Sequence, residues 1–238
     1  YMRKRAFPAI PPMRHQVVEE GRNIGRYELG APLMRSPFGV VLSAAAPKGT
    51  GEAAEAGEPL SNMLVIEKEG VKELGGMKLI NSALRTMQTL RQAPHPNLPV
   101  LMDMFQTPTR VVVQLQHLGD CTLFARMKQS GRPMGAAAIT SLVPQISSAI
   151  AHLHLVARIA HRDLKPENIV IRQASMHEQR IEVKVTGFEL ATMEATSQLP
   201  CGTMPFVAPE VILADTAKYA CRPADMWSFG ILIMELAC

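Results

Sequence analysis

The chain has 238 residues, of which 47% are hydrophobic, 19% charged and 5% aromatic, and its formal net charge is +4. This length is enough for one large domain or two lobes with a buried core, and high apolar content with low net charge excludes an intrinsically disordered chain. The small basic excess is spread along the chain, so composition predicts no nucleic-acid partner. The longest apolar run, residues 226–234, is shorter than the roughly 20 residues of a membrane-spanning helix, so no membrane span is predicted.

The N-terminal half has the pattern of a strand-rich unit. Residues 1–25 contain three prolines and scattered charge and predict a poorly ordered leader without a core of its own. Residues 47–59, which are mostly Gly, Ala, Glu and Pro, predict a surface loop. The elements expected between these segments and the middle of the chain are strands at 38–42, 63–66 and 111–115 and a helix at 78–93.

The C-terminal half has a mainly helical pattern. Apolar residues at helical spacing predict a helix at 136–157, and residues 225–238 predict a second helix that is largely buried. Short β-prone runs at 169–171 and 183–185 predict two strands joined by a polar connection. The order of elements therefore indicates a small β-rich lobe followed by a larger helical lobe.

The four cysteines, Cys121, Cys201, Cys221 and Cys238, include no CxxC pair. Their spacing predicts neither a zinc site nor a disulfide framework, and a reducing, cytoplasmic compartment is the expectation.

The decisive segment is residues 161–168, which read His-Arg-Asp-Leu-Lys-Pro-Glu-Asn. It matches the catalytic loop of the protein kinases at all eight positions. Transfer of a phosphoryl group to a hydroxyl needs a nearby carboxylate, which Asp163 supplies. Lys165 can screen charge on the moving group, and Asn168 can hold a metal ion through its amide oxygen.

Further motifs follow in the order of a protein kinase domain. Residues 95–97 match the HPN turn, Thr203 lies in a GTxxF segment, residues 208–210 are Ala-Pro-Glu, and residues 225–230 match DxWSxG. Over residues 27–238 the chain therefore resembles a Ser/Thr protein kinase domain, loosely of the calcium/calmodulin-dependent kind.

The resemblance implies an α+β, bilobal kinase fold. The leader at 1–25 would precede a small β-rich N-lobe at 26–115, a hinge at 116–121 and a larger α-helical C-lobe at 122–238. The C-lobe is expected to be incomplete, because kinases carry further helices after the central helix that begins at Asp225.

The resemblance also implies ATP as a ligand and a protein substrate or protein partner. Thr203 and Glu210 would belong to the activation segment. The residues that it assigns to the nucleotide site are Leu33, Gly39, Val41, Val65, Lys68, Leu115, Gln116, Leu118 and Val170.

Several kinase motifs are altered. The DFG motif aligns with residues 187–189, so that Gly187 stands in place of the metal-binding Asp and Asn168 remains as the expected metal ligand. Glu189, which replaces the Gly of the motif, is the alternative carboxylate, two residues from the usual position. Met34 and Ser36 replace the first two glycines of the Gly-rich loop, where glycine allows backbone N–H groups to approach phosphates. These changes argue against Mg²⁺ binding.

The lysine that anchors the phosphates has two possible registers. In the favoured register Glu67 takes its place, and in the other register Lys68 keeps it. Residues 74–93 contain no acidic residue that could act as its partner.

The altered motifs predict a pseudokinase with weak or absent phosphoryl transfer. An active Ser/Thr kinase that uses Asp163, Lys165, Asn168 and Lys68 with an unusual metal ligand is the alternative, and a damaged gene fragment is a third hypothesis. Nucleotide binding that depends on Mg²⁺ discriminates between the first two.

Overall fold

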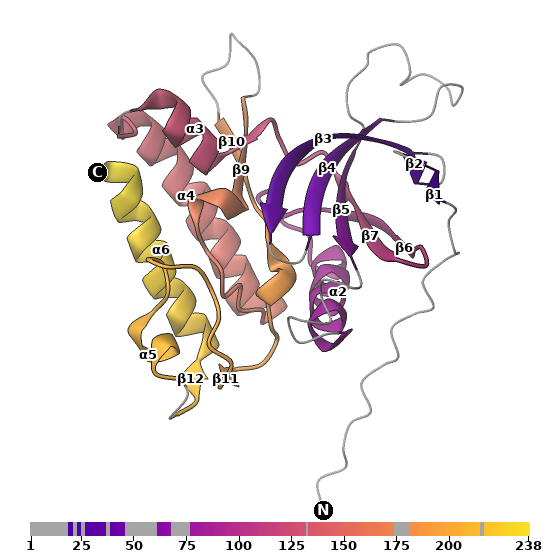
Figure 1. The fold of residues 1–238 in the computed structure, drawn as a ribbon. Coiled ribbons are helices and arrows are strands. Elements are labelled where there is room, and N and C mark those ends of the chain that lie inside the picture. The colour runs from indigo at the N-terminus through magenta and orange to yellow at the C-terminus, as the bar shows by residue number, and fades with distance from the viewer. Residues whose placement is uncertain are drawn as a thin grey trace, which may run out of the picture.

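The computed structural model describes residues 19–20, 23–24, 27–36, 39–45, 61–67, 77–131, 133–173, 181–214 and 217–238. These residues form a sheet-rich lobe and a mainly helical lobe that lie side by side (Figure 1). The predicted loop at 47–59 and Lys68 lie outside the described residues.

The first lobe is built on a sheet of seven strands within the described part of the chain, in the order β1-β2-β3-β4-β5-β7-β6. All neighbouring strands in it are antiparallel. The strands are β1 (Glu19–Glu20), β2 (Asn23–Ile24), β3 (Tyr27–Ser36), β4 (Gly39–Ala45), β5 (Ser61–Glu67), β6 (Leu101–Gln106) and β7 (Arg110–Gln116). Strands β1 and β2, which lie within the predicted leader, pair at the edge of this sheet.

Helix α2 (Met77–Gln92) packs against the inner face of the sheet, between the two lobes (Figure 1). Its buried side chains, Ala83, Leu84, Met87 and Leu90, recur at the three- and four-residue spacing that places them on one face. The helix ends before Pro94, which has no N–H group to continue the helical hydrogen bonds. The predicted helix at 78–93 is confirmed within one residue at each end.

The second lobe carries the longer helices. Its helices are α3 (Leu123–Ser130), α4 (Ala136–His152), which continues into the π-helical turn η1 (Leu153–Ala157), α5 (Pro209–Ile212) and α6 (Cys221–Ala237). Its strands are β8 (Cys121–Thr122), β9 (Ile169–Gln173), β10 (Ile181–Val185), β11 (Thr196–Ser197) and β12 (Tyr219–Ala220), with single 3-10 turns at η2 (Pro166–Asn168) and η3 (Phe188–Leu190). The predicted strands at 169–171 and 183–185 are confirmed and pair with each other in antiparallel fashion.

Helix α4 with η1 forms the centre of this lobe. Its 22 residues are long and apolar enough to cross a membrane by length and composition, which differs from the prediction that the chain has no membrane span. The face that carries Leu142, Ile146, Ala149 and Ile150 is buried in the core, as expected for a central helix of a packed lobe.

Helix α6 is less buried than the sequence predicts. Leu232 and Leu236 are fully buried, whereas Met226, Trp227 and Met234 expose 50%, 47% and 62% of their surface.

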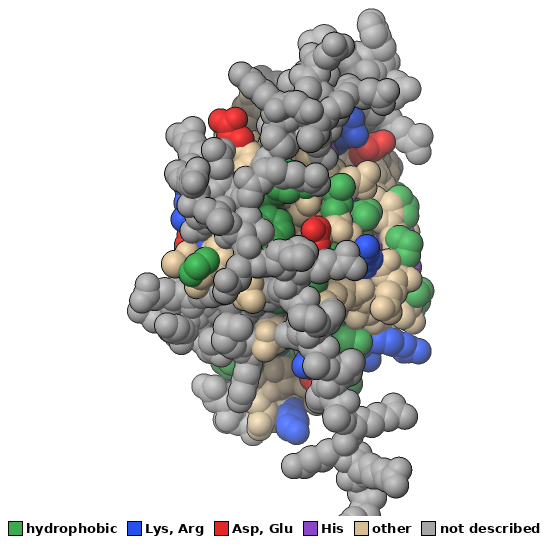
Figure 2. All heavy atoms as spheres, turned by 90° about the vertical axis from the view of Figure 1, so that its right-hand side faces the viewer, with side chains coloured by type: hydrophobic (Ala, Val, Ile, Leu, Met, Phe, Trp, Pro, Cys, Tyr) green, Lys and Arg blue, Asp and Glu red, His purple; other side chains and the backbone are tan. Residues whose placement is uncertain are grey.

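On the β6 side of the molecule, Figure 2 shows hydrophobic side chains in separate groups with charged side chains between them.

Candidate active site

The loop at residues 161–168 lies between η1 and β9 and is held by one buried carboxylate. Asp225, which is 1% exposed, accepts hydrogen bonds from the backbone N–H groups of His161 and Arg162, each at 2.7 Å. Its Oδ2 atom also lies 2.8 Å from Nε2 of His154. The first residue of the DxWSxG motif thus positions the start of the loop, although more than 60 residues separate the two in sequence.

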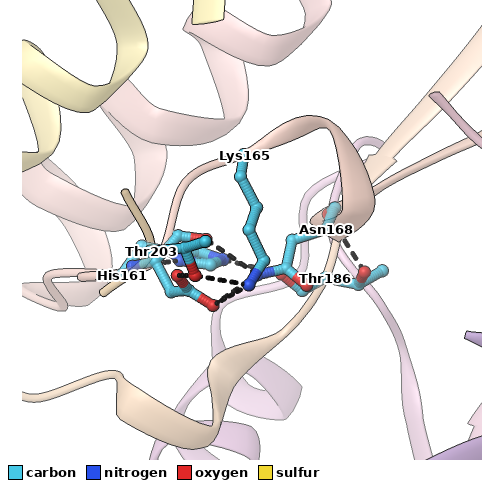
Figure 3. A network of polar contacts seen from close by, with 6 residues as sticks. His161, Lys165, Asn168, Thr186 and Thr203 are labelled. Atoms are coloured by element: carbon cyan, nitrogen blue, oxygen red, sulfur yellow. Dashed lines mark hydrogen bonds and ion pairs between the residues drawn. The ribbon is translucent and has the colours of Figure 1, made fainter. Parts of the chain in front are cut away.

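The two partners of His161 define its protonated nitrogen. Nε2 lies 2.6 Å from the carbonyl oxygen of Thr186, which can only accept, so Nε2 carries the hydrogen. Nδ1 then accepts the backbone N–H of Asp163 at 3.2 Å. His161 therefore connects the loop to the residue that precedes Gly187 (Figure 3).

Asp163 forms one polar network with Lys165, Asn168 and Thr203, the last three of which are labelled in Figure 3. Lys165 Nζ lies 2.9 Å from Asp163 Oδ2 and donates to Thr203 Oγ1 at 2.6 Å. Thr203 in turn donates to Asp163 Oδ1 at 2.7 Å. Asn168 Nδ2 donates to the Asp163 carbonyl at 2.7 Å and to its Oδ2 at 3.0 Å. The structure therefore brings together all three predicted catalytic residues and the activation-segment threonine.

These residues do not make a fitting site for Mg²⁺. Magnesium at phosphoryl-transfer sites is usually held by one or two carboxylates together with substrate phosphates. Gly187 supplies no ligand, and the Asp163 carboxylate is already engaged by Lys165 and Thr203. Among the residues that the structure describes, no group of three or more His, Cys, Asp and Glu side chains gathers to hold a metal ion.

Arg162 and Tyr219 join the loop to the segment that follows it, and neither is among the site residues predicted from the sequence. Arg162 donates to Tyr219 Oη at 3.0 Å and to the Leu199 carbonyl at 2.9 Å. Tyr219 donates to the same carbonyl at 3.0 Å. Burial, more than the neighbouring Cys201 thiol, raises the pKa of Tyr219 to about 12, so this hydroxyl stays protonated and able to donate. No local motif marks Tyr219, because its contacts are all distant in sequence.

Most of the predicted nucleotide residues belong to the large apolar cluster that extends through both lobes, and the part of the fold where these residues meet is called the cleft below. Leu33 packs against this cluster, and Val41, Leu115, Leu118 and Val170 are buried members of it. Gly39 approaches β5 closely, because a Cβ atom there would lie 3.2 Å from Cα of Ile66 and nearer still to the Val65 carbonyl. Gln116 is exposed at the end of β7.

Val65 lies on the other face of the sheet, which differs from the expected pocket position. It packs with Met63, Val112, Phe105 and Leu29 in a separate outer cluster. Side chains alternate along a strand, so Glu67 lies on this outer face too.

The favoured register, in which Glu67 replaces the anchoring lysine, is therefore wrong, because Glu67 does not face the cleft. It is exposed and makes a 2.6 Å ion pair with Arg110, the residue opposite it in the ladder. Within Ser61–Glu67 the side chains that alternate onto the inner face are Asn62, Leu64 and Ile66, none of which carries a positive charge. The role of Lys68 stays a prediction, because Lys68 lies outside the described residues.

The HPN turn links the lobes through backbone contacts. The carbonyl oxygen of Asn97 accepts the N–H of Val185 at 2.8 Å, and Asn97 Nδ2 donates to the Val183 carbonyl at 2.9 Å. His152 bonds the Ala93 carbonyl at 3.0 Å. His152 therefore has a different partner from His154, which faces Asp225.

Comparison with known proteins identifies similar sequences. The family model described as protein kinase domain matches residues 49–238. The chain is 34% identical over 152 residues to myosin light chain kinase A of Dictyostelium discoideum, which covers 63% of this chain and 49% of that protein. It is 30% identical over 234 residues to serine/threonine-protein kinase 33 of Mus musculus, which covers 94% of this chain and 44% of that protein. It is also 30% identical over 227 residues to CBL-interacting protein kinase 16 of Oryza sativa subsp. japonica, which covers 93% of this chain and 45% of that protein. The chain spans about half the length of these curated relatives.

Proposed function

The chain belongs to the protein kinase family, and from this premise we propose that it is a pseudokinase of the Ser/Thr type. It would act as a signalling or scaffold module with a kinase fold and weak or absent phosphoryl transfer. Other proteins would be its partners, and the intracellular, cytoplasmic location predicted from its cysteines belongs to the same proposal.

The observation that carries the proposal is the surrounding of Gly187. The residue has a φ of +80°, and a Cβ atom added to it would lie 2.5 Å from Asn168 Oδ1 and 2.7 Å from Asn168 Nδ2. The position that would carry the metal carboxylate thus has no ligand atoms, and a side chain there would require the Asn168 carboxamide to shift. Helix α2, whose residues Met77–Gln92 include no acid, provides no carboxylate partner for a phosphate-anchoring lysine.

Thermal unfolding with ATP, in the presence and absence of Mg²⁺, tests the proposal. A ligand that binds the folded state at a hundred times its Kd stabilises that state by about 2.7 kcal/mol, which is readily measured. We expect Mg²⁺ to add no stabilisation to that of ATP alone. A large stabilisation that depends on Mg²⁺ would contradict the proposal.

An active Ser/Thr kinase is the second candidate, and the network around Asp163 favours it. The carboxylate could accept the proton of a substrate hydroxyl, and Lys165, 2.9 Å away, could stabilise the charge of the transferred group. Phosphorylation of a peptide library by the wild-type chain, absent from Asp163→Asn, would establish this candidate in place of the first. We expect no such activity.

A further inference from the structure

A β-bulge in β3 directs two consecutive side chains toward the cleft between the lobes. Pro32 pairs with Leu42 and Met34 pairs with Val41, so that Leu33 is the extra residue on β3. Proline has no N–H group for the ladder and is tolerated in strands at such bulges, which re-aim the side chains that follow. Leu33 and Met34 accordingly both pack in the inner apolar cluster, where strict alternation would have placed only one of them.

Met34 is part of a row of side chains that crosses the sheet. The ladders place Met34 opposite Val41, Val41 opposite Leu64 and Leu64 opposite Val113. All four are buried, with 7% exposure or less. The position of Met34 is therefore set by the pairing of four strands.

The sulfur of Met34 reaches the second lobe. Thr186 Oγ1 lies 3.5 Å from Met34 Sδ and 3.0 Å from the carbonyl oxygen of Asn168, to which the Thr186 N–H also donates at 2.8 Å. Thr186 directly precedes Gly187. Met34 thus lies at the end of the cleft where the loop residues meet Gly187, which is the end at which phosphates would lie.

Asn62 occupies the other end of the cleft. It lies on the inner face of β5, is 1% exposed, and its Oδ1 accepts the backbone N–H of Leu118 at 2.8 Å. Its Nδ2 donates to the Leu42 carbonyl at 3.4 Å. Leu118 follows β7 in the predicted hinge, so the hinge N–H that a ring nitrogen of a base could use already has an acceptor from the chain itself.

We propose that Asn62 and Met34 occupy the cleft as internal substitutes for a nucleotide and exclude it. The Asn62 carboxamide takes the hydrogen bond of the base, and the Met34 side chain takes the space of the phosphates. The inference rests on the proposed function because both assume that this cleft is the place where a protein kinase would bind its nucleotide. A nucleotide must displace a buried hydrogen bond at one end and a buried thioether at the other.

Titration calorimetry with adenosine and with ADP in EDTA tests each end separately, on the full chain. Asn62→Ala frees the Leu118 N–H, so we expect it to raise the affinity for both ligands about tenfold. This corresponds to about 1.4 kcal/mol of binding free energy. Met34→Ala opens the phosphate end, so it should raise the affinity for ADP about tenfold and that for adenosine much less. The double variant should show both gains.

Two controls distinguish removal of a blocking side chain from the cleft from a general loosening of the sheet lobe. Met34→Leu keeps the side-chain volume and should show no gain. Met63→Ala removes a buried methionine from the outer cluster and should leave both affinities at the wild-type level. If either Met34→Ala or Asn62→Ala fails to fold, the other still tests its own end of the cleft.

The inference is overturned if folded Asn62→Ala and Met34→Ala bind no better than the wild-type chain, or if Met63→Ala gains as much. Tight binding of adenosine by the wild-type chain would overturn it as well. Failure of the proposed function has a different signature, which is an increase in ATP affinity on adding Mg²⁺ to the wild-type chain.

Discussion

The side-chain amide of Asn168 fills the space directly beside Cα of Gly187. A Cβ atom at residue 187 would lie 2.7 Å from Asn168 Nδ2, closer than the 3.0 Å below which real Cβ contacts essentially do not occur. The φ of +80° adds a second penalty for residues other than glycine, and this penalty is smaller for Asn and Asp than for other side chains.

Restoring the missing carboxylate should therefore destabilise the chain. We expect Gly187→Asp to lower the free energy of unfolding by about 1–3 kcal/mol or more, the usual cost of strained backbone, with the crowding of Asn168 added to it. We also expect no gain in Mg²⁺ binding, because the Gly-rich loop is altered too and α2 offers no acidic partner for an anchoring lysine. Urea unfolding and calorimetry with Mg²⁺ and ADP measure the two effects.

Gly131 provides the matched control for the cost of placing aspartate at a positive φ. It has a φ of +60° at the end of α3, and nothing lies within 4 Å of a Cβ atom placed there. Gly131→Asp should cost less than Gly187→Asp, and the difference reports the crowding by Asn168. Phosphorylation of peptides by Gly187→Asp alone would show that one carboxylate was the only defect.

Removal of the Asp225 carboxylate should disrupt the start of the loop at residues 161–168. Asp225→Ala leaves the buried N–H groups of His161 and Arg162 without an acceptor, at about 1–3 kcal/mol each. We expect a loss of about 3 kcal/mol in unfolding free energy, and a smaller loss for Asp225→Asn, which keeps one oxygen. Glu210→Ala on the exposed side of α5 is the control and should change stability by less than about 0.5 kcal/mol.

Loss of the Tyr219 hydroxyl should loosen the segment that contains Thr203. Tyr219→Phe deprives the Arg162 guanidinium of one acceptor and the Leu199 carbonyl of one donor. We expect a loss of about 1–2 kcal/mol in stability and faster proteolytic cleavage between residues 190 and 203. Ser197→Ala removes a longer 3.3 Å contact with Arg162 and a 3.0 Å hydrogen bond from the exposed Leu199 N–H, so it should have a smaller effect. Equal cleavage rates for Tyr219→Phe and the wild-type chain would contradict this role.

His95 should make stability depend on pH. Burial, followed by the neighbouring charges of His152 and Lys184, lowers the pKa of His95 below its usual 6.5. The folded state therefore favours neutral His95, and this contribution is present above pH 6.5 and is lost as pH falls through the lowered value. Protonation would also place a hydrogen on Nδ1, which accepts the Asn97 N–H at 3.2 Å.

Denaturant unfolding between pH 5 and 8 measures this dependence. We expect stability to fall as the pH decreases across this range. His95→Asn keeps an acceptor for the Asn97 N–H without titrating, so its slope should be shallower than that of the wild-type chain. Parallel slopes would assign the effect to other groups.

The sequence by itself determined the lobes, the principal elements and the active-site loop. Hydrophobic periodicity is a local property, so α2, α4 and the β9–β10 pair could be predicted within a few residues. The loop at 161–168 is contiguous, and for this reason Asp163, Lys165 and Asn168 could be identified by type and spacing alone. The same holds for Gly187, because the absence of a carboxylate is visible without a structure.

Only the tertiary structure decided which side chains face the cleft. The irregular pairing of β3 around Pro32 brought Leu33 and Met34 together against the inner cluster, and alternation along β5 placed Val65 and Glu67 on the outer face. Thr186, Asn62 and Tyr219 act through partners 18 to 152 positions away in the chain. Such contacts depend on how the lobes and strands meet in space, and no local pattern of residues encodes them.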